Sequence, residues 1–201
     1  MGSCGPVAVH ALRRLRQGRE RRLDAARLKH TREADMNMLH HRFEIVDKSM
    51  FRNGMSRLGS SVNVVSTMAG DKRYGFTASA VCSVSDTPPT LLVCINRAIS
   101  CFPAFENARH FCVNTLMPGQ EDISNAFGGL IRTEDRFSFG QWGEGISGNP
   151  VLLDASVSFE CELVNAVDQA THCVMFGRVI GIRENEERAT LLYCMRRYLT
   201  G

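Results

Sequence analysis

Residues 75–100 read GFTASAVCSVSDTPPTLLVCINRAIS, and this stretch decides the fold class. Residues 75–85 alternate strictly, as expected of a strand with two different faces. One face carries Phe76, Ala78, Ala80, Cys82 and Val84, and the other carries Thr77, Ser79, Val81, Ser83 and Ser85. A turn rich in proline at 86–89 and an apolar run at 90–95 follow, which predicts a second strand buried on both faces.

The face that carries the hydroxyl groups is a candidate binding surface, because its side chains are small. A large flat ligand could lie close to the backbone there, and the Thr and Ser hydroxyls could bind a phosphate or a sugar chain. The alternative is an antiparallel strand with a solvated polar face, and the pattern alone favours that alternative.

The composition is that of a globular domain with an appendage. The chain has 201 residues, 44% of them hydrophobic, and a formal net charge of +3, which gives no case for a dedicated nucleic-acid binder. Its 8 cysteines show no spacing typical of disulfides or of a metal site, and most lie within apolar strand patterns. We therefore expect a reducing, cytoplasmic environment, with no metal and no membrane span.

The N-terminal segment differs from the rest of the chain. Its first 35 residues contain nine Lys or Arg against four acidic residues, and few apolar side chains. We expect residues 1–40 to be a basic extension, helical or disordered, and residues 41–201 to be the folded domain. A nucleic-acid-binding arm is the alternative, but interleaved aromatic residues are missing.

Strands predominate along the remaining chain, with short helices between them. Apolar spacing predicts a helix over 43–58 that packs on the barrel, followed by a strand at 62–67. Further strands are expected at 111–116, 156–167, 171–182 and 190–194, with short helices from residue 101 and over 120–127. Few long crossovers remain, which indicates a mainly antiparallel β-barrel with flanking helices.

Residues 143–148, GEGISG, match the dinucleotide fingerprint G-x-G-x-x-G by their letters only. That motif requires a strand before it and a helix after it, and Asn149-Pro150 disfavours the helix. No nucleophile elbow, zinc-protease motif or Walker loop is present either. This absence is compatible with a protein in which a bound cofactor carries the chemistry.

Several blocks in order resemble the flavin reductases of two-component monooxygenases, which are FMN-binding split-barrel proteins. The blocks span residues 51–198 and are FRNGMSRLGSSVNVVST (51–67), GFTASAVCSVSDTPPTLLVCIN (75–96), FCVNTL (111–116), FGG (127–129), DRF (135–137), THCVMFGRV (171–179) and RRY (196–198). Within this family, the reductases of pyrimidine degradation are more similar to the chain than those of aromatic-compound degradation.

The resemblance implies an NADH-dependent enzyme that reduces FMN or FAD and supplies free reduced flavin to a partner monooxygenase. It also implies a homodimer. The alternatives are a flavin- or haem-binding split-barrel protein without catalytic activity, and a module that binds a partner or nucleic acid through its basic arm. Transfer between the two cofactors requires their rings to stack at roughly 3–3.5 Å, so the expected site is a shaped slot.

By resemblance, the flavin site draws on the central stretch and on two later segments. The residues implied are Thr77, Ala78, Ser79, Ala80, Ser83, Asn96, Arg97, Ser100, Cys101, Asn114 and Phe127. Arg97 would neutralise phosphate charge, with the free amides of the helix that begins near residue 101 beside it, and Asn114 would bind the flavin or order its loop. From the residues alone, Asn96 and Ser100 are equally typical of turn caps.

The resemblance places the nicotinamide of NADH at three residues. His172 matches the family's nicotinamide-side histidine, although Ala170-Thr171 precede it where the family has glycine or aspartate. Arg197 and Tyr198 match the basic–aromatic segment near NADH, but Leu199 follows where a histidine is common. No residue is expected to act as an acid or base, and His172 is a positioning candidate.

Overall fold

The computed structural model describes residues 46–186 and 189–200. Contacts separate the segment up to Arg52 from a compact unit, Asn53–Gly201. The predicted basic extension, residues 1–40, lies outside the described residues.

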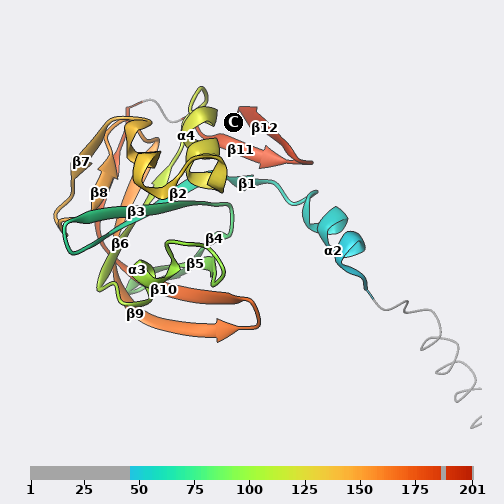
Figure 1. Ribbon diagram of the computed structural model, residues 1–201, viewed down its shortest axis with the longest axis horizontal. Helices are drawn as coiled ribbons and strands as arrows, with labels where there is room; N and C mark the ends of the chain where they lie inside the picture. Colours follow the sequence, from blue (N-terminus) through green and yellow to red (C-terminus); the bar gives the residue numbers. More distant parts are fainter. Residues whose placement is uncertain (1–45, 187–188, 201) are drawn as a thin grey trace, which may run out of the picture. The chain divides into compact units, whose positions relative to one another are not determined.

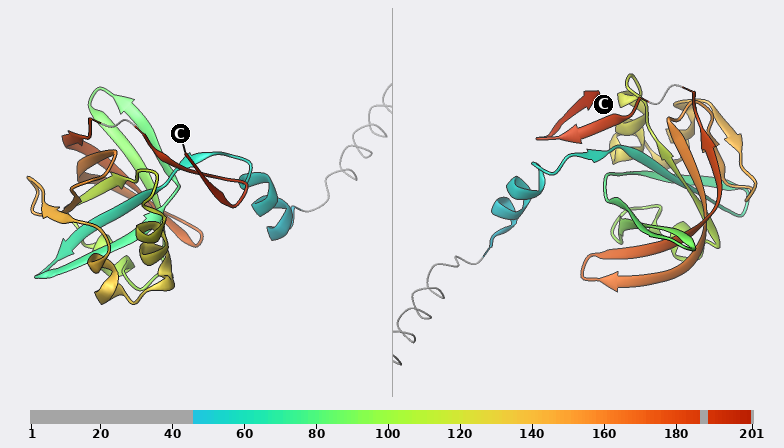
Figure 2. Two further views of the ribbon diagram at one scale, coloured as in Figure 1. Left: turned by 90° about the horizontal axis from the view of Figure 1, so that it is seen from above. Right: turned by 180° about the vertical axis from the view of Figure 1, so that it is seen from behind.

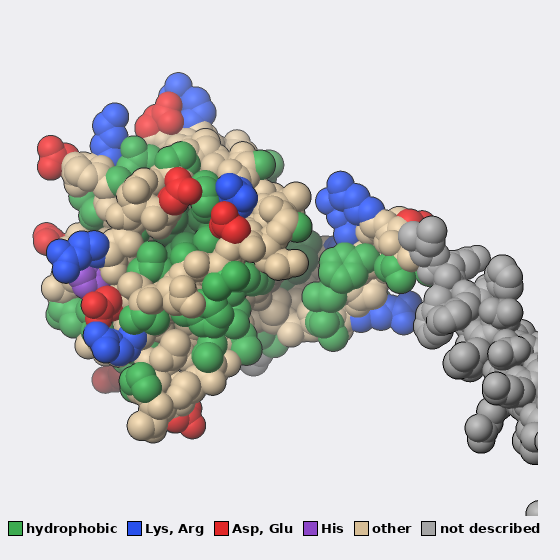
Figure 3. Space-filling model, turned by 90° about the horizontal axis from the view of Figure 1, so that it is seen from below, with side chains coloured by type: hydrophobic (Ala, Val, Ile, Leu, Met, Phe, Trp, Pro, Cys, Tyr) green, Lys and Arg blue, Asp and Glu red, His purple; other side chains and the backbone are tan. Residues whose placement is uncertain are grey.

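The first described element is helix α2 (Lys48–Met55), shorter than the helix predicted over 43–58. The backbone amide of Met50 donates to Asp47 Oδ1 at 2.7 Å, which caps the first turn. None of the α2 side chains is buried, and the packing of this helix on the barrel stays a prediction. In Figure 3, hydrophobic and basic side chains lie next to one another on the segment that adjoins the grey residues.

Seven antiparallel strands form the main sheet, in the order β3-β2-β6-β9-β10-β5-β4 (Figure 1). They are β2 (Asn63–Ala69), β3 (Lys72–Ala78), β4 (Val81–Asp86), β5 (Pro89–Asn96), β6 (His110–Thr115), β9 (Val157–Gln169) and β10 (His172–Glu184). The predicted mainly antiparallel barrel with short helices is confirmed.

The strand predicted over residues 75–85 is two strands, because the chain breaks at Ser79–Ala80. Before the break β3 pairs with β2, and after it β4 pairs with β5. These are the two edges of the sheet, so the break carries the chain from one edge to the other and closes the barrel (Figure 1). Consequently Phe76 and Ala78 are buried, whereas Val84 on β4 is exposed.

Strand β5 was predicted to be buried on both faces, and this was wrong in part. Leu91, Val93 and Ile95 are buried, but the alternate side chains are only half-buried. The half-buried face includes Cys94 and Asn96. It is therefore open on the side where a ligand could lie.

A second, smaller sheet contains β1 (Ser60–Ser61), β11 (Leu191–Cys194) and β12 (Arg197–Thr200). Figure 2 shows the β11–β12 hairpin apart from the seven-stranded sheet. Strand β12 was not predicted, because Met195 and Arg196 turn the chain with φ of 50° and 61°. Such turns usually carry Asn or Gly, and no turn signal was visible here.

Short helical elements cover the barrel ends: α3 (Phe102–Glu106), α4 (Glu121–Asn125), the helical turn η1 (Ala126–Leu130) and the 3-10 helix η2 (Thr133–Ser138). Residues 143–148 contain the end of β7 (Trp142–Glu144) and most of the loop that joins it to β8 (Pro150–Leu152) in a hairpin. No helix follows this glycine-rich segment, so its interpretation as a chance match is confirmed.

Two groups of buried side chains form the interior. One lies inside the main sheet and includes Val93, Phe105 and Phe111. The other packs Leu116 and Phe127 beneath α4 and η1. The seven cysteines within the described residues are free thiols. No helix in the described part of the chain has the length and apolar character needed to cross a membrane.

Candidate functional site

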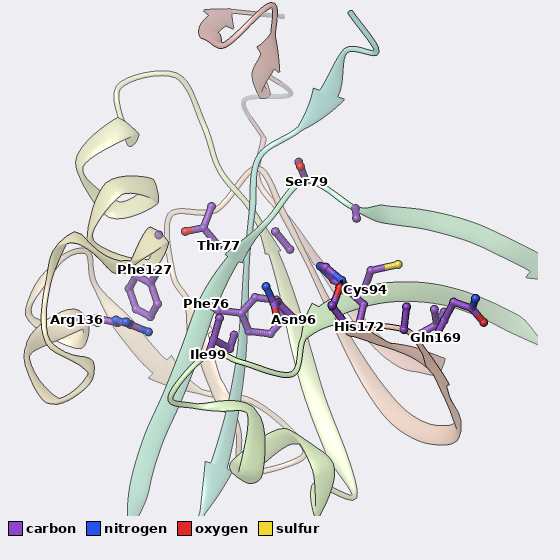
Figure 4. A pocket seen from close by; sticks show the side chains of 17 residues that line it. Phe76, Thr77, Ser79, Cys94, Asn96, Ile99, Phe127, Arg136, Gln169 and His172 are labelled. Atoms are coloured by element: carbon purple, nitrogen blue, oxygen red, sulfur yellow. Dashed lines mark hydrogen bonds between the residues drawn. The ribbon is translucent and has the colours of Figure 1, made fainter. Parts of the chain in front are cut away.

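A cavity of about 600 Å³ lies beside the break between β3 and β4, and we name it the central cavity. Residues 76–80 form one wall, with Cys94, Asn96 and Ile99 next to them. Phe127, Gly128, Gly129 and Arg136 line one end, and Val174 with the β9–β10 turn, residues 169–172, lines the other. Figure 4 shows Phe127 and Arg136 on one side and His172, Cys94 and Gln169 on the opposite side.

Seven of the predicted site residues line this cavity: Thr77, Ala78, Ser79, Ala80, Asn96, Phe127 and His172. They come from β3, from the break after it, from β5, from η1 and from the start of β10. The barrel closure brings these segments together, because β5 pairs with β10 and His172 lies opposite Asn96 in the register. Residues nearly a hundred positions apart thus share one cavity.

Some polar groups of this wall already form hydrogen bonds within the protein. Thr77 Oγ1 donates to the carbonyl oxygen of Ser124 at 2.7 Å, which ties β3 to α4. Asn96 Oδ1 accepts from the amide of Ala98 at 2.9 Å, as a turn cap does. The hydroxyl of Ser79 remains exposed at the break. Ser79 therefore offers this cavity a hydroxyl that forms no hydrogen bond within the described residues.

His172 stands at the rim of the central cavity, at the first position of β10. Its Nδ1 lies 2.9 Å from Thr171 Oγ1. Ala170, in the same turn, has φ of 50°, a conformation that L side chains rarely adopt. The turn therefore holds His172 beside the cavity on a strained backbone.

Arg136 was not predicted as a site residue, although the DRF block contains it. Its side chain is only 8% exposed, and Nε and Nη1 donate to the carbonyl oxygens of Ile131 and Gly75 at 3.2 and 2.9 Å. No carboxylate within the described residues pairs with it, so the cavity wall carries a buried positive charge. Only tertiary contacts reveal this, because the sequence pattern around Arg136 is that of a polar loop.

Two buried predicted residues do not reach the cavity. Asn114 is fully buried, and its side chain bonds to Val64, Ser66, Leu152 and Ser158 within the barrel wall. Cys101 is also fully buried. Burial raises the pKa of the Cys101 thiol, and the nearby Arg136 partly offsets this rise. Asn114 therefore joins strands within the barrel, whereas Cys101 contacts β3, where its Sγ lies 3.7 Å from the carbonyl oxygen of Gly75.

Arg97 was expected to face a phosphate, but its Nη1 lies 3.3 Å from the Asp168 carboxylate on β9. Both side chains are about half exposed, so the pair is worth little by itself. Arg97 lines none of the cavities described here, and neither does Ser83, which is exposed on β4. The partner of Arg97 is 71 positions away, beyond the reach of a local pattern.

A neighbouring cavity of about 370 Å³, the tyrosine cavity, is bounded by Tyr193 and Tyr198. It shares Thr77, Ser79 and Gly128 with the central cavity. The Tyr198 hydroxyl lies 3.0 Å from both Ser124 Oγ and Asn125 Oδ1, which fixes its ring over α4. Arg197, its predicted companion, does not line this cavity.

A third cavity of about 630 Å³, the basic cavity, contains the remaining predicted residue, Ser100. Residues 72–74 of β3 and Thr133, Glu134 and Phe137 of η2 complete its lining. Cys94, in the central cavity, is the one thiol among the described residues that line these three cavities, and burial raises its pKa. No described group combines three or more metal-ligating side chains.

The fold and these cavities define a flavin-reductase class of split barrel. The flavin reductase like domain family matches residues 55–201, and the chain belongs to this family. It is 48% identical over 153 residues to the FMN reductase (NADH) RutF of Pantoea ananatis, covering 76% of this chain and 80% of that protein.

Solved structures of flavin reductases are similar to this fold. A putative flavin reductase from Haemophilus somnus superposes with a TM-score of 0.75 at 38% identity, over 78% of this chain and 100% of that one. BorF, the flavin reductase component of a bacterial two-component tryptophan halogenase, gives a TM-score of 0.71 at 27% identity, over 77% and 98%. The fold prediction and the predicted family are thus confirmed.

Proposed function

We propose that this protein is an NADH-dependent flavin reductase that reduces FMN, or FAD, and supplies free reduced flavin to a partner monooxygenase. The observation that carries the proposal is the central cavity, which is open beside Thr77 and Ser79. Its volume of about 600 Å³ is within the usual range for cofactor sites. The similarity to an FMN reductase that uses NADH supports the choice of both cofactors.

The lining residues fit a flavin. Residues 77–80 have no side chain larger than threonine, so a tricyclic ring can lie against the backbone there. Phe127 offers an aromatic face at one end, and Arg136 offers positive charge close to it. When bound, the flavin supplies the redox chemistry by accepting a hydride from the nicotinamide. The protein contributes alignment, desolvation and charge.

We assign His172 to the nicotinamide side of the cavity, opposite Phe127 and Arg136 (Figure 4). The contact with Thr171 orients its ring, which leaves Nε2 for the substrate. Tyr198 is assigned to NADH through the tyrosine cavity, which adjoins the central cavity at Thr77 and Ser79. Arg197 is also assigned to NADH, and this assignment rests on the family resemblance.

The remaining predicted flavin residues take indirect roles in this proposal. Asn114 holds β2, β6 and β9 together, and Cys101 packs against β3, with its Sγ 3.7 Å from the carbonyl oxygen of Gly75. Arg97 positions the segment that presents His172, because its backbone amide donates to the carbonyl oxygen of Thr171 at 3.0 Å and its guanidinium lies beside Asp168. We keep Ser83 as a residue beside the entrance of the central cavity. We keep Ser100 as a residue near the ribityl–phosphate end of the flavin.

The cellular setting belongs to the same proposal. BorF is the flavin reductase component of a two-component tryptophan halogenase, which supports a two-component system here. Pyrimidine or aromatic-compound degradation is the pathway that the family resemblance implies. Val164, Val167 and Ile182 on β9 and β10 are about half exposed, as expected of a homodimer surface. The free thiols support a cytoplasmic location. Residues 41–201 would be the reductase domain, and 1–40 an accessory extension.

The direct test is NADH oxidation by the purified chain with and without added FMN, FAD or riboflavin. We expect turnover that depends on flavin and exceeds the rate of the flavin alone. Tight flavin binding without turnover would favour the alternative, a flavin- or haem-binding protein without catalytic activity. Size-exclusion chromatography with light scattering tests the dimer, and Val167→Asp should shift it toward the monomer.

A further inference from the structure

Three polar residues form one row across strands β5, β10 and β9, and we name them the polar row. His172 is paired in the register with Asn96 on β5 and with Gln169 on β9. Side chains of directly paired residues on antiparallel strands lie on the same face, with their Cβ atoms roughly 4.5–5.5 Å apart. All three residues line the central cavity, and Figure 4 shows His172 and Gln169 at the end away from Phe127. The polar row therefore borders the cavity on its nicotinamide side.

The next row along β5 and β10 is apolar. Cys94 and Val174 are paired with each other, two positions from Asn96 and His172, and both line the central cavity. Because side chains alternate along a strand, this apolar pair lies on the same face as the polar row. A planar ring that carries an amide substituent fits this arrangement. Its ring can lie on the apolar pair while its amide reaches the polar row.

Within the polar row, Gln169 has the side chain whose hydrogen-bonding groups are not yet used. Asn96 Oδ1 accepts from the backbone amide of Ala98 at 2.9 Å, and His172 Nδ1 lies 2.9 Å from Thr171 Oγ1. Gln169 is exposed, and its side-chain amide forms no hydrogen bond within the described residues. It can therefore donate and accept at the same time. A carboxamide presents the matching acceptor and donor.

We propose that Gln169 recognises the carboxamide group of the nicotinamide and is a specificity-determining residue for NADH. Its amide donates to the carboxamide oxygen and accepts from the carboxamide NH2 group. The assignment rests on the proposed function, which gives the nicotinamide to the side of His172, and deepens it by naming the group that is read. The pyrimidine edge of a flavin also presents donors and acceptors. The flavin, however, is assigned to the wall at residues 77–80, so Gln169 is left for the nicotinamide.

The test compares NADH with its reduced 3-acetylpyridine analogue, in which a methyl group replaces the carboxamide NH2, at saturating FMN. Gln169→Met keeps the length of the side chain and removes its amide. We expect the KM for NADH to rise by about fivefold or more with little change in kcat. The preference for NADH over the analogue, as a ratio of kcat/KM values, should fall by about fivefold. Gln141→Met, the same change at an exposed position that lines none of the three cavities, should keep the wild-type values.

Equilibrium binding gives a readout that needs no turnover. Calorimetry with NAD+ and its 3-acetylpyridine analogue should show the same loss of preference in Gln169→Met, while the affinity for FMN changes less than about twofold. A preference that survives in this variant would overturn the assignment. A loss of FMN affinity as large as that for NAD+ would also overturn it, by moving Gln169 to the flavin. In both cases FMN-dependent NADH oxidation by the wild type would leave the proposed reductase function standing. If the wild type oxidised no NADH with any flavin, that function would fail, and calorimetry would still decide the role of Gln169.

Discussion

The backbone of Gly75 lies against the ring of Phe127. A Cβ atom at position 75 would be 2.7 Å from Phe127 Cε1 and 3.2 Å from the carbonyl oxygen of Val65. The contact joins β3 to η1 at the end of the central cavity, where Phe127 is one of the lining residues. Only glycine allows the strand and the ring to come this close.

Gly75→Ala should therefore displace the Phe127 ring into the cavity or push β3 away from it. We expect a loss of roughly 1–3 kcal/mol in the free energy of unfolding, together with weaker FMN binding. Urea denaturation and a flavin titration measure the two effects. Gly54→Ala is the control, because a Cβ atom at position 54 would meet nothing within 4 Å. This variant should lower neither the free energy of unfolding nor the FMN affinity. Unchanged FMN affinity in Gly75→Ala would remove Phe127 from the flavin site.

Ser79→Trp should close the gap at the break between β3 and β4. Ser79 is exposed and lines both the central and the tyrosine cavity, so the indole can fill either without disturbing the core. We expect FMN affinity to fall by at least about tenfold with little change in the unfolding midpoint. Val84→Trp, at an exposed position of β4 outside the described cavities, is the control. Equal effects of the two variants would show that the wall is misassigned.

His172→Ala should raise the KM for NADH by about tenfold, because one oriented hydrogen bond to the substrate is lost. FMN binding should change less, since the imidazole stands across the cavity from Phe127 and Arg136. Thr171→Val removes the 2.9 Å contact with Nδ1 but keeps the imidazole, and should give a smaller rise in KM. Steady-state kinetics over both substrates separate these effects. A larger loss for FMN than for NADH would move His172 to the flavin side.

Local patterns predicted those parts of the fold that local chemistry determines. Proline at 88–89 marked the β4–β5 turn, and the apolar run that follows it became β5. The break at Ser79–Ala80 was missed because side-chain alternation continues across it, and only the pairing with β2 and β5 divides the strand. In the site, small residues predicted the wall. The burial of Arg136 and the Arg97–Asp168 pair depend on segments far apart in sequence, so no pattern revealed them.

Ala170→Gly should stabilise the protein. Ala170 has φ of 50°, which costs an L residue about 1–2 kcal/mol, and glycine adopts this conformation freely. Part of that gain is offset by the entropy that glycine loses on folding, so we expect a net gain of up to about 1 kcal/mol in urea denaturation. Ala166→Gly, within β9, should have the opposite sign. Destabilisation by Ala170→Gly would mean that the turn does not hold this conformation in solution.

Stability should fall in alkaline solution as buried thiols ionise. Burial, with a smaller contribution from Glu160, raises the pKa of Cys161 from 9.0 to about 12. Because the folded state holds this proton more tightly than the unfolded state, the stability it contributes is complete below pH 9. It is lost as the pH rises toward 12, by up to roughly 4 kcal/mol in all.

Cys161→Ala should therefore flatten the fall in unfolding free energy above pH 9, whatever its effect at neutral pH. Part of the fall should persist in this variant, because burial also raises the pKa of Cys112 well above its usual value. For the wild type and for the variant, urea denaturation at neutral pH and near pH 10.5 gives the slope of the unfolding free energy against pH. Cys82→Ala, which removes an exposed thiol, should keep the wild-type slope. If Cys161→Ala also kept it, the Cys161 thiol would have to ionise equally in the folded and unfolded states.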